Sequence, residues 1–481
     1  TWNGSVMEII VCDTQEHRQQ IEGYLAHKWG LQNNLAIDHP YLSVFSIDSN
    51  GSLTTNKTFD YETDDRNYSI TVHATDDHNA SFDKNFTIIV TNVVEDLDGD
   101  GIEDHNDTDI DGDGLTNAEE LAYNSDPWDA SSSNQPPSDI NASNLTIAEN
   151  SAIGNVIGEL NATDPDGDGN FSYELVPQLP SDLNLSLWLD ASDASAITAS
   201  NDSVSQWADK SGNNYHAQQS TPNYMPKLKH NSINGKSTIF FDGSNDILSA
   251  SNRLGLSVNP AITIFFVCEI SSLVGDSDAL FQIGQNDGCL MINGGSGRWG
   301  WRHNNGNKLF TSVSVDTPLL LSFVRPNGSN YSSSEFYLNG TEQVSSSTAS
   351  GTRSPSDSSS YYYIGYNKKS GAQYTHGKYG EIIVINSDSV VFRQEIEGYL
   401  AQKWGLVNSL PNDHSYKIPK FALDTNGTLT ANQTFDYETD DRNYSITVRV
   451  TDDHNVSFDK NFTVTVANVV EDMDGDGTED H

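Results

Sequence analysis

Hydrophobic and polar residues alternate along most of the chain in short runs separated by Gly, Asn and Ser. YSITVHATD and NFTIIVTNV follow a period of two, and FSIDSNGSL places an Asn-Gly pair between two such runs, which predicts a hairpin. From Leu183 onward, runs such as LSLWLDASD, STIFFDGSNDIL, AITIFFVCEI and YGEIIVIN continue this pattern. The sequence therefore predicts a protein built mainly of strands and turns.

One segment follows helical spacing instead. Phe392, Ile396, Tyr399, Leu400 and Trp404 stand at i, i+4, i+7, i+8 and i+12, which predicts an amphipathic helix whose apolar face packs on a sheet. Residues 16–30 hold a second copy of this segment. A short helical piece is also expected over 117–123, ended by Asn124 and Pro127.

The chain contains a long internal repeat. IEGYLAHKWGL at 21–31 recurs as IEGYLAQKWGL at 396–406, an offset of 375 residues. DYETDDRNYSITV at 60–72 recurs at 436–448, an offset of 376. EDLDGDG likewise returns as EDMDGDG. The sequence thus holds about one and a quarter repeats, and we expect it to be a fragment of a longer multi-repeat protein.

The stretch Glu95–Glu120 is the strongest chemical signal. It holds twelve Asp and Glu residues and no Lys or Arg. It reads as two tandem twelve-residue loops with oxygen-bearing side chains at positions 1, 3, 5, 9 and 12 and Gly at position 6, the spacing of calcium-binding loops. The predicted ligands are Asp96, Asp98, Asp100, Asp104 and Asp107 in the first loop, and Asp109, Asp111, Asp113, Asn117 and Glu120 in the second. The alternative is a disordered acidic linker.

Composition narrows the function further. The net charge is −43, with a pI near 4.3, which argues against binding to nucleic acid or to an anionic membrane. Three cysteines are too few for a disulfide scaffold, and we expect buried thiols. The longest apolar run, 261–268, is too short to span a bilayer.

Three stretches resemble known families. AEN at 148–150, DPDGDG at 164–169 and DYE at 436–438 make residues 139–176 together with 419–472 resemble one bacterial cadherin-like domain. LWLDASD, WADKSGN, FFDGSND and the terminal KWGL make 183–410 resemble a bacterial laminin-G-like jelly roll of the concanavalin A-like lectin/glucanase superfamily. The run ending in LTNAEELAYNSDPWDAS resembles the thrombospondin type 3 calcium repeat.

These resemblances imply an all-β fold: a cadherin/Ig-like β-sandwich with an inserted concanavalin A-like jelly roll, plus a calcium-loop linker. A rival arrangement would pair 139–176 with 41–95 across the linker. The implied organisation is a laminin-G-like remnant (1–40), a second cadherin-like half (41–95), calcium repeats (96–129), a linker (130–138), a first cadherin-like half (139–180), the inserted jelly roll (181–418), a second cadherin-like half (419–472) and the start of another calcium repeat (473–481).

The cadherin-like resemblance also implies a ligand set for calcium at the domain end. Carried onto this sequence, the ligands are Glu149, Asp436, Glu438 and Asp472, with Asp164 and Asp166 facing the preceding linker, and Asp474 and Asp476 beginning the next calcium repeat. In the first copy the matching residues are Asp60, Glu62 and Asp96.

Within the jelly roll, Trp299 and Trp301 alternate on an expected strand and so face the same way. With Arg302 beside them, they are candidates for a sugar-stacking platform; the alternative is a stripe of core side chains. Asp242, Asn245 and Asp246 are candidates either for a further calcium site or for a turn.

We expect no enzymatic activity. The GEIIVIN strand offers a single acid, whereas two-carboxylate glycoside hydrolysis needs a pair. The favoured function is a calcium-binding extracellular or cell-surface adhesion fragment whose calcium-rigidified β modules present a lectin-like domain to glycans or surface proteins. Alternatives are a carbohydrate-binding region of a larger secreted enzyme and a passive spacer. Any membrane contact is expected only through parts outside this fragment.

Overall fold

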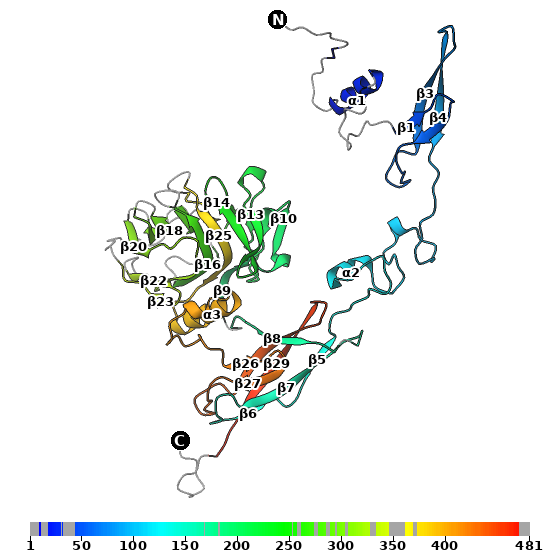
Figure 1. Ribbon diagram of the computed structural model, residues 1–481. Coiled ribbons are helices and arrows are strands. Elements are labelled where there is room, and N and C mark those ends of the chain that lie inside the picture. Colours follow the sequence, from blue (N-terminus) through cyan, green and yellow to red (C-terminus); the bar gives the residue numbers. More distant parts are fainter. Residues whose placement is uncertain are drawn as a thin grey trace. The chain divides into compact units, whose positions relative to one another are not determined.

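The chain forms two compact units, Thr1–Ser133 and Asn134–His481 (Figure 1). The computed structural model describes residues 9–10, 18–29, 31, 44–167, 169–180, 183–252, 254–256, 261–273, 278–284, 289–293, 296–303, 306–327, 333–345, 361–368 and 373–470. Strands dominate both units, so the predicted all-β fold is confirmed. None of the described helices is long and apolar enough to cross a membrane.

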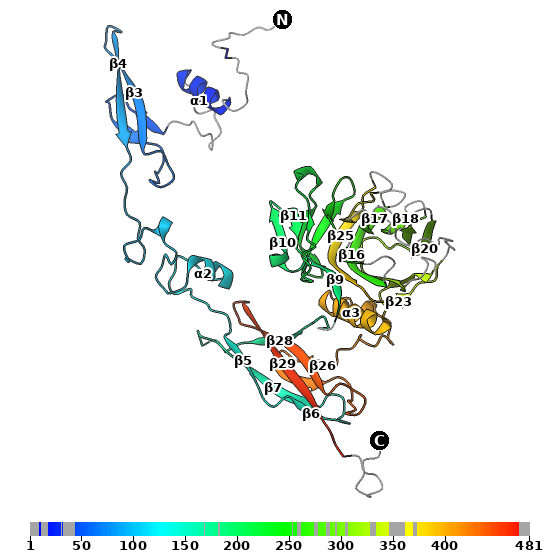
Figure 2. The same cartoon turned by 180° about the vertical axis from the view of Figure 1, so that it is seen from behind.

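The second unit contains a small sandwich whose strands come from two distant parts of the sequence (Figures 1 and 2). Its two sheets have the orders β26-β27-β7-β5 and β6-β29-β28-β8. The strands are β5 Asp139–Ala142, β6 Thr146–Ala148, β7 Val156–Thr163, β8 Ser172–Val176, β26 Phe421–Leu423, β27 Thr428–Ala431, β28 Asn443–Thr451 and β29 Ser457–Ala467. In these ladders Leu429 lies opposite Gly158, and Val450 opposite Tyr173.

Apolar side chains from both sheets meet in one core, which includes Ile140, Leu160, Phe435 and Val448. Each sheet therefore needs strands from both 139–176 and 421–467. The whole large sheet lies, in sequence, between β8 and β26.

Among the described residues, the large sheet of the second unit is antiparallel and has seventeen strands in the order β10 to β25 followed by β9. The strands are β9 Leu185–Asp190, β10 Ile197–Ser200, β11 Ser203–Trp207, β12 Ala217–Gln218, β13 Lys227–Ile233, β14 Lys236–Asp242, β15 Leu248–Ala250, β16 Ile262–Ser272, β17 Asp278–Ile283, β18 Cys289–Asn293, β19 Arg298–His303, β20 Gly306–Ser312, β21 Pro318–Arg325, β22 Glu335–Leu338, β23 Thr341–Glu342, β24 Tyr362–Ile364 and β25 His376–Ile385. Additional pairings, such as β16 with both β21 and β25, fold the sheet back on itself around one core.

Strand β16 explains why the sequence pattern loses its alternation at 262–268. Phe266 and Cys268 point into the core between the layers, whereas Phe265 and Val267 point to the opposite face. Helix α3, Val390–Lys403, covers that second face with Ile396, Leu400 and neighbouring apolar side chains (Figure 1). Because both faces are covered, the strand is apolar throughout.

The motifs that mark the jelly roll meet in one buried polar network. The Glu381 carboxylate, on β25, has no exposed surface. It accepts hydrogen bonds from the indole N–H groups of Trp188 and Trp404, each at 2.7 Å, and from the Tyr399 hydroxyl at 2.9 Å. The Lys403 ammonium lies 2.8 Å from Glu381 and 2.7 Å from Asp190. The KWGL ending therefore fixes α3 to the sheet through a fully satisfied carboxylate.

The first unit holds α1 Arg18–Lys28, the paired strands β1 Phe45–Ile47 and β2 Leu53–Thr55, the hairpin β3 Asn67–Thr75 and β4 Ser81–Ile89, and α2 Asn117–Tyr123. Strands β1–β4 repeat the sequence of β26–β29 in a different environment. Leu53 is 44% exposed, while its counterpart Leu429 is fully buried. Phe86 is likewise 45% exposed. The described part of this unit provides no strands equivalent to β5–β8.

This difference in burial predicts that equivalent mutations in the two copies lower the free energy of unfolding by different amounts. Leu429→Ala should lower the free energy of unfolding of its unit by about 2–5 kcal/mol, because it leaves a cavity in a closed core. Leu53→Ala should cost less than about 1 kcal/mol, because an exposed side chain loses little burial. Urea unfolding of the full chain, followed for each unit, measures both. Equal losses would mean that β1–β4 have a closed core of their own.

Candidate calcium sites

The two acidic loops of the first unit fold in the same way. The carboxylate at position 1 accepts a hydrogen bond from the amide of the position-6 glycine in each: Gly101 to Asp96, and Gly114 to Asp109, both at 3.2 Å. Gly101 and Gly114 have φ of 96° and 102°, which L side chains rarely adopt. The predicted glycine spacing therefore has the expected conformational cause.

The second loop gathers carboxylates that each keep at least one oxygen without a hydrogen-bond donor among the described residues. Oxygens of Asp109, Asp111 and Asp113 lie within 4.8 Å of one another. Helix α2, which begins at a Thr116–Glu119 capping box, adds Glu120, whose exposure is 0%. Both Glu120 oxygens, and one oxygen of each of these three Asp side chains, are buried without a hydrogen-bond donor among the described residues. Buried acceptors grouped in this way fit a divalent cation with oxygen ligands.

The electrostatics of the second loop also favour a bound cation. Burial, and then the carboxylates of Asp111, Asp113 and Asp109, raise the pKa of Glu120 to about 7. Burial and neighbouring carboxylates also raise the pKa of Asp111. At neutral pH these groups repel one another unless a cation lies among them.

The first loop brings Asp96, Asp98 and Asp100 together in a more exposed cluster. The Asp100 amide N–H donates to Asp98 and favours its charged form, but desolvation and the Asp100, Asp107 and Asp96 carboxylates together raise the pKa of Asp98. A side chain at Gly112 would meet Asp98 Oδ2 at 2.7 Å, so the two loops pack directly against each other.

Two predicted ligands brace the backbone of their own loops. Asp104 Oδ1 accepts a hydrogen bond from the Leu97 amide at 2.8 Å, and Asn117 Oδ1 accepts one from the Ile110 amide at 3.0 Å. These are the position-9 side chains, and each bonds the backbone at position 2 of its own loop. These Oδ1 atoms therefore brace the loops. Because the Asn117 Nδ2 also donates to the Asp107 carbonyl at 2.9 Å, a bracing role replaces the ligand assignment of Asn117, whereas the assignment of Asp104 stays a prediction for its Oδ2 atom.

Asp107, predicted to close the first loop, has one oxygen that accepts from the Asp109 amide at 2.9 Å. Its other oxygen is buried without a donor among the described residues, which leaves it available to a cation. Asp126 was missed by the sequence analysis: its charge contributes to the raised pKa of Glu120. The only signal for it was its place in the NSDPWDAS ending of the repeat.

In the sandwich, the structure brings Glu149, Asp436 and Glu438 within 4.8 Å of one another. Glu149 is 3% exposed and accepts hydrogen bonds from the Val469 and Tyr437 amides, which lower its pKa. It thereby joins β6 to the segments after β27 and β29, whether or not an ion is bound. Asp472, Asp474 and Asp476 lie outside the described residues.

Asp166 contacts the preceding linker, while the implied position of Asp164 against the linker stays a prediction; the two residues form no metal cluster among the described residues. Asp166 accepts a hydrogen bond from the Gln135 amide. Its own amide donates to Asp164 Oδ1 at 2.8 Å. These contacts fix the linker to the sandwich directly.

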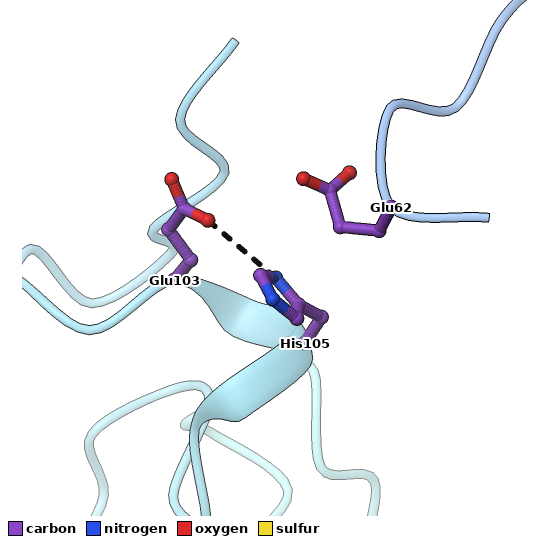
Figure 3. Close-up of side chains that lie close together, drawn as sticks. All are labelled: Glu62, Glu103 and His105. Atoms are coloured by element: carbon purple, nitrogen blue, oxygen red, sulfur yellow. Dashed lines mark ion pairs between the residues drawn. The ribbon is translucent and has the colours of Figure 1, made fainter. Parts of the chain in front are cut away.

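In the first unit, Glu62 lies with Glu103 and His105 rather than with Asp60 and Asp96 (Figure 3). His105 Nδ1 is 3.6 Å from Glu103, which also accepts a hydrogen bond from Asn92 at 2.9 Å. His105 is exposed, and the polar contacts of Glu103 are satisfied by protein groups. We assign no ion to this group.

The tryptophans proposed as a sugar platform are core residues. Trp299 is 0% and Trp301 3% exposed. Trp301 stacks on Phe323 with ring centroids 3.9 Å apart, and Trp299 packs against Phe336. A sugar ring cannot reach either without opening the core, so the alternative of a core stripe is the correct one. The Arg302 side chain lies outside the described part.

Asp242 and Asp246 form a turn. Asp246 Oδ2 accepts from the Asp242 amide at 2.8 Å, and Asp242 Oδ1 accepts from the Ser244 amide at 2.7 Å. This geometry supports the turn, rather than the calcium site, at FFDGSND.

The sequence of the second loop and α2 has a family match. Residues 109–130 match the bacterial TSP3 repeat. The oxygens of Asp109, Asp111, Asp113 and Glu120 that have no donor among the described residues thus lie within a TSP3 repeat, a class of calcium repeat. No curated protein matches the chain.

Several solved structures are similar to this chain at low identity. Trypanosoma rangeli sialidase is 13% identical, with a TM-score of 0.32 over 47% of this chain and 33% of its own, so the chain spans about a third of that protein. Domain 4 of an extracellular arabinanase from Geobacillus stearothermophilus, in complex with arabinotriose, is 12% identical (TM-score 0.30; 43% and 93% covered). The receptor-binding domain of botulinum neurotoxin type G is 14% identical (TM-score 0.30; 46% and 51% covered).

The Glu120 environment predicts a pH dependence. Calcium needs ionised Glu120, and its pKa is about 7 without an ion, so affinity at the TSP3 loop should fall by up to about tenfold per pH unit below 7. Without calcium, the stability of the fold depends on pH in the opposite direction. The folded pKa exceeds the ordinary 4.5, so the folded chain binds more protons than the unfolded chain between these values. Stability without calcium should therefore fall as pH rises through this range.

Calorimetric calcium titrations from about pH 5.5 to 7.5, in buffers of different protonation enthalpy, measure the affinity and the proton released. An affinity that does not change across this range, with no proton released, would contradict the assignment of Glu120 as a ligand.

Proposed function

We propose that this chain is a calcium-binding extracellular module in which ion-filled loops stiffen the connection between β domains that present a lectin-like jelly roll, for adhesion or attachment to surface polymers. The observation that carries the proposal is the buried Glu120 carboxylate, whose two oxygens have no donor among the described residues and which lies near the charges of Asp109, Asp111 and Asp113. The bacterial TSP3 match at the same residues supports it.

The mechanism is mechanical. Without calcium, the carboxylates of the loops repel one another and favour extended, variable conformations. An ion in each loop removes that repulsion, and the contact between Gly112 and Asp98 then couples the two filled loops. Extracellular calcium modules have dissociation constants of roughly 10⁻⁴–10⁻³ M, so the loops would fill outside the cell. The proposal includes no catalytic step.

Small-angle X-ray scattering of the full chain tests the stiffening. We expect millimolar calcium to narrow the distribution of particle dimensions relative to excess chelator, and magnesium at the same concentration to do so much less. A distribution that calcium leaves unchanged would refute calcium-dependent stiffening.

A second candidate function is carbohydrate binding by the large sheet. A row of uncharged Tyr, Gln and Ser side chains on its outer face favours this function, because such rows combine flat apolar rings with hydrogen-bonding groups.

A further inference from the structure

Five strands of the large sheet place polar side chains side by side on its outer face. Gln206 on β11 lies opposite Gln218 on β12, which lies opposite Ser249 on β15. Ser249 lies opposite Tyr363 on β24, and Tyr363 opposite Gln282 on β17. Residues directly opposite in antiparallel strands share a face, so these five form one row across the sheet.

The direction of the row follows from its neighbours. Trp207, Ala217, Leu248 and Tyr362 each precede or follow a row residue in sequence, and all four have 0% exposure in the core. Side chains alternate along a strand, so the row points away from the core.

Tyrosines extend the row at β24. The Tyr361 and Tyr363 rings stack with centroids 6.0 Å apart, Tyr363 meets Tyr366 at 5.9 Å, and Tyr366 meets Tyr374 at 5.1 Å. Burial raises the pKa of Tyr374 most, followed by the neighbouring Tyr366 and then Tyr224, so Tyr224 lies close to Tyr374. Tyr361 and Tyr224 remain 43% and 45% exposed. We call these five tyrosines with Gln206, Gln218 and Ser249 the tyrosine row.

The tyrosine row is uncharged at neutral pH although the chain carries a net charge of −43. The Gln218 amide donates to Gln206 at 2.6 Å, which holds both amides in place across the strands. The Gln282 side chain, opposite Tyr363, is 2% exposed and accepts a hydrogen bond from the Lys368 backbone amide at 2.9 Å, so it ends the row without being part of the exposed surface. Such a surface has no charges to pair with a charged polymer. It has aromatic rings and amide groups that an uncharged polymer can contact.

We propose that the tyrosine row is a binding site for a neutral glycan. The apolar faces of the sugar rings would stack on Tyr361, Tyr363 and Tyr374, while sugar hydroxyls exchange hydrogen bonds with Gln218 and Ser249. The inference rests on the candidate carbohydrate-binding function and gives it a location. The tyrosine row takes the place of Trp299 and Trp301 as the candidate sugar-binding surface, because both tryptophans lie in the core of the large sheet.

Affinity electrophoresis of the full chain tests the site, with arabinan, galactan, xylan, mannan and β-glucan as separate immobilised probes in millimolar calcium. The test variants are Tyr361→Ala and Tyr363→Ala, and Tyr363→Phe preserves the ring. Tyr24→Ala is the matched control, because Tyr24 is 49% exposed and belongs to α1 of the other unit. Thermal melting of every variant verifies folding.

We expect at least one probe to bind, both alanine variants to bind it about tenfold more weakly, and Tyr363→Phe and Tyr24→Ala to bind it as the wild type does. If Tyr363→Ala does not fold, the result rests on Tyr361→Ala, because the Tyr361 side chain is more exposed and its loss should disturb the fold less. Binding that neither alanine variant weakens would overturn the tyrosine row while leaving carbohydrate binding intact.

Failure of every glycan probe would overturn both the tyrosine row and the carbohydrate-binding candidate. Binding of a proline-rich peptide in place of all the glycans would have the same consequence, because stacked aromatic rings also bind such peptides. Neither result affects the calcium proposal, which is measured separately.

Discussion

Glu120→Gln is expected to weaken calcium binding at the TSP3 loop by more than about 100-fold. The substitution keeps the shape of the side chain but removes the charge that interacts with Asp109, Asp111 and Asp113. Changes to groups that only support metal ligands already cost 10–100-fold, so loss of a buried ligand should cost more. Isothermal titration calorimetry of the full chain measures the affinity and the number of ions bound.

The matched control is Glu119→Gln, one residue earlier in the same helix. Glu119 accepts hydrogen bonds from the Thr116 amide and hydroxyl and faces away from the cluster. Because Gln can also occupy the N3 position of a capping box, we expect little change in stability and no change in the number of bound ions.

Glu120→Gln should also have opposite effects with and without calcium. In chelator the variant lacks one repelling charge and should be at least as stable as the wild type near pH 8. In calcium it should be less stable, because it loses the ion's contribution. A variant that is destabilised equally in both conditions would show that Glu120 is simply a structural residue.

Trp404→Ala is expected to lower the free energy of unfolding of the second unit by about 3–5 kcal/mol. Trp404 has no exposed surface, and its loss would open a cavity between α3 and the sheet. It would also remove the indole that donates to Glu381, a buried carboxylate whose pKa is raised by burial and by Asp190. Urea unfolding followed by circular dichroism measures the loss.

Trp29→Ala is the matched control, because Trp29 is the equivalent of Trp404 in the first copy of the repeat. Trp29 occupies the same KWGL motif but is 39% exposed in the first unit. We expect it to cost less than about 1 kcal/mol. Similar costs for the two substitutions would mean that the network around Glu381 contributes little to stability.

The sequence predicted features that depend on local spacing. Period-two alternation identified strands such as β28, and helical spacing identified α3. The predicted short helix over 117–123 is confirmed as α2, with Asn124 in the left-handed conformation at its end. Glycine at position 6 of each acidic loop was predictive because only glycine adopts that backbone conformation at low cost.

Features that depend on distant partners could not be predicted in the same way. The alternation of Trp299 and Trp301 showed that they share a face, but not that Phe323 and Phe336 cover it. A twelve-residue template marks Asp104 and Asn117 as oxygen-bearing, yet it cannot show that the backbone amide at position 2 of each loop donates to their Oδ1 atoms. The tyrosine row is assembled on strands β11, β12, β15 and β24, which are separated by long stretches of sequence, so no local pattern marks it.

The central claim is that calcium occupies the acidic loops and stabilises the fold around them. Thermal melting of the full chain in millimolar calcium and in excess chelator, alongside a calorimetric calcium titration, tests it most directly. We predict binding of at least two ions and a melting temperature that is several degrees higher with calcium. Unchanged melting and no heat of binding would contradict the claim and identify the acidic stretch as a solvated linker.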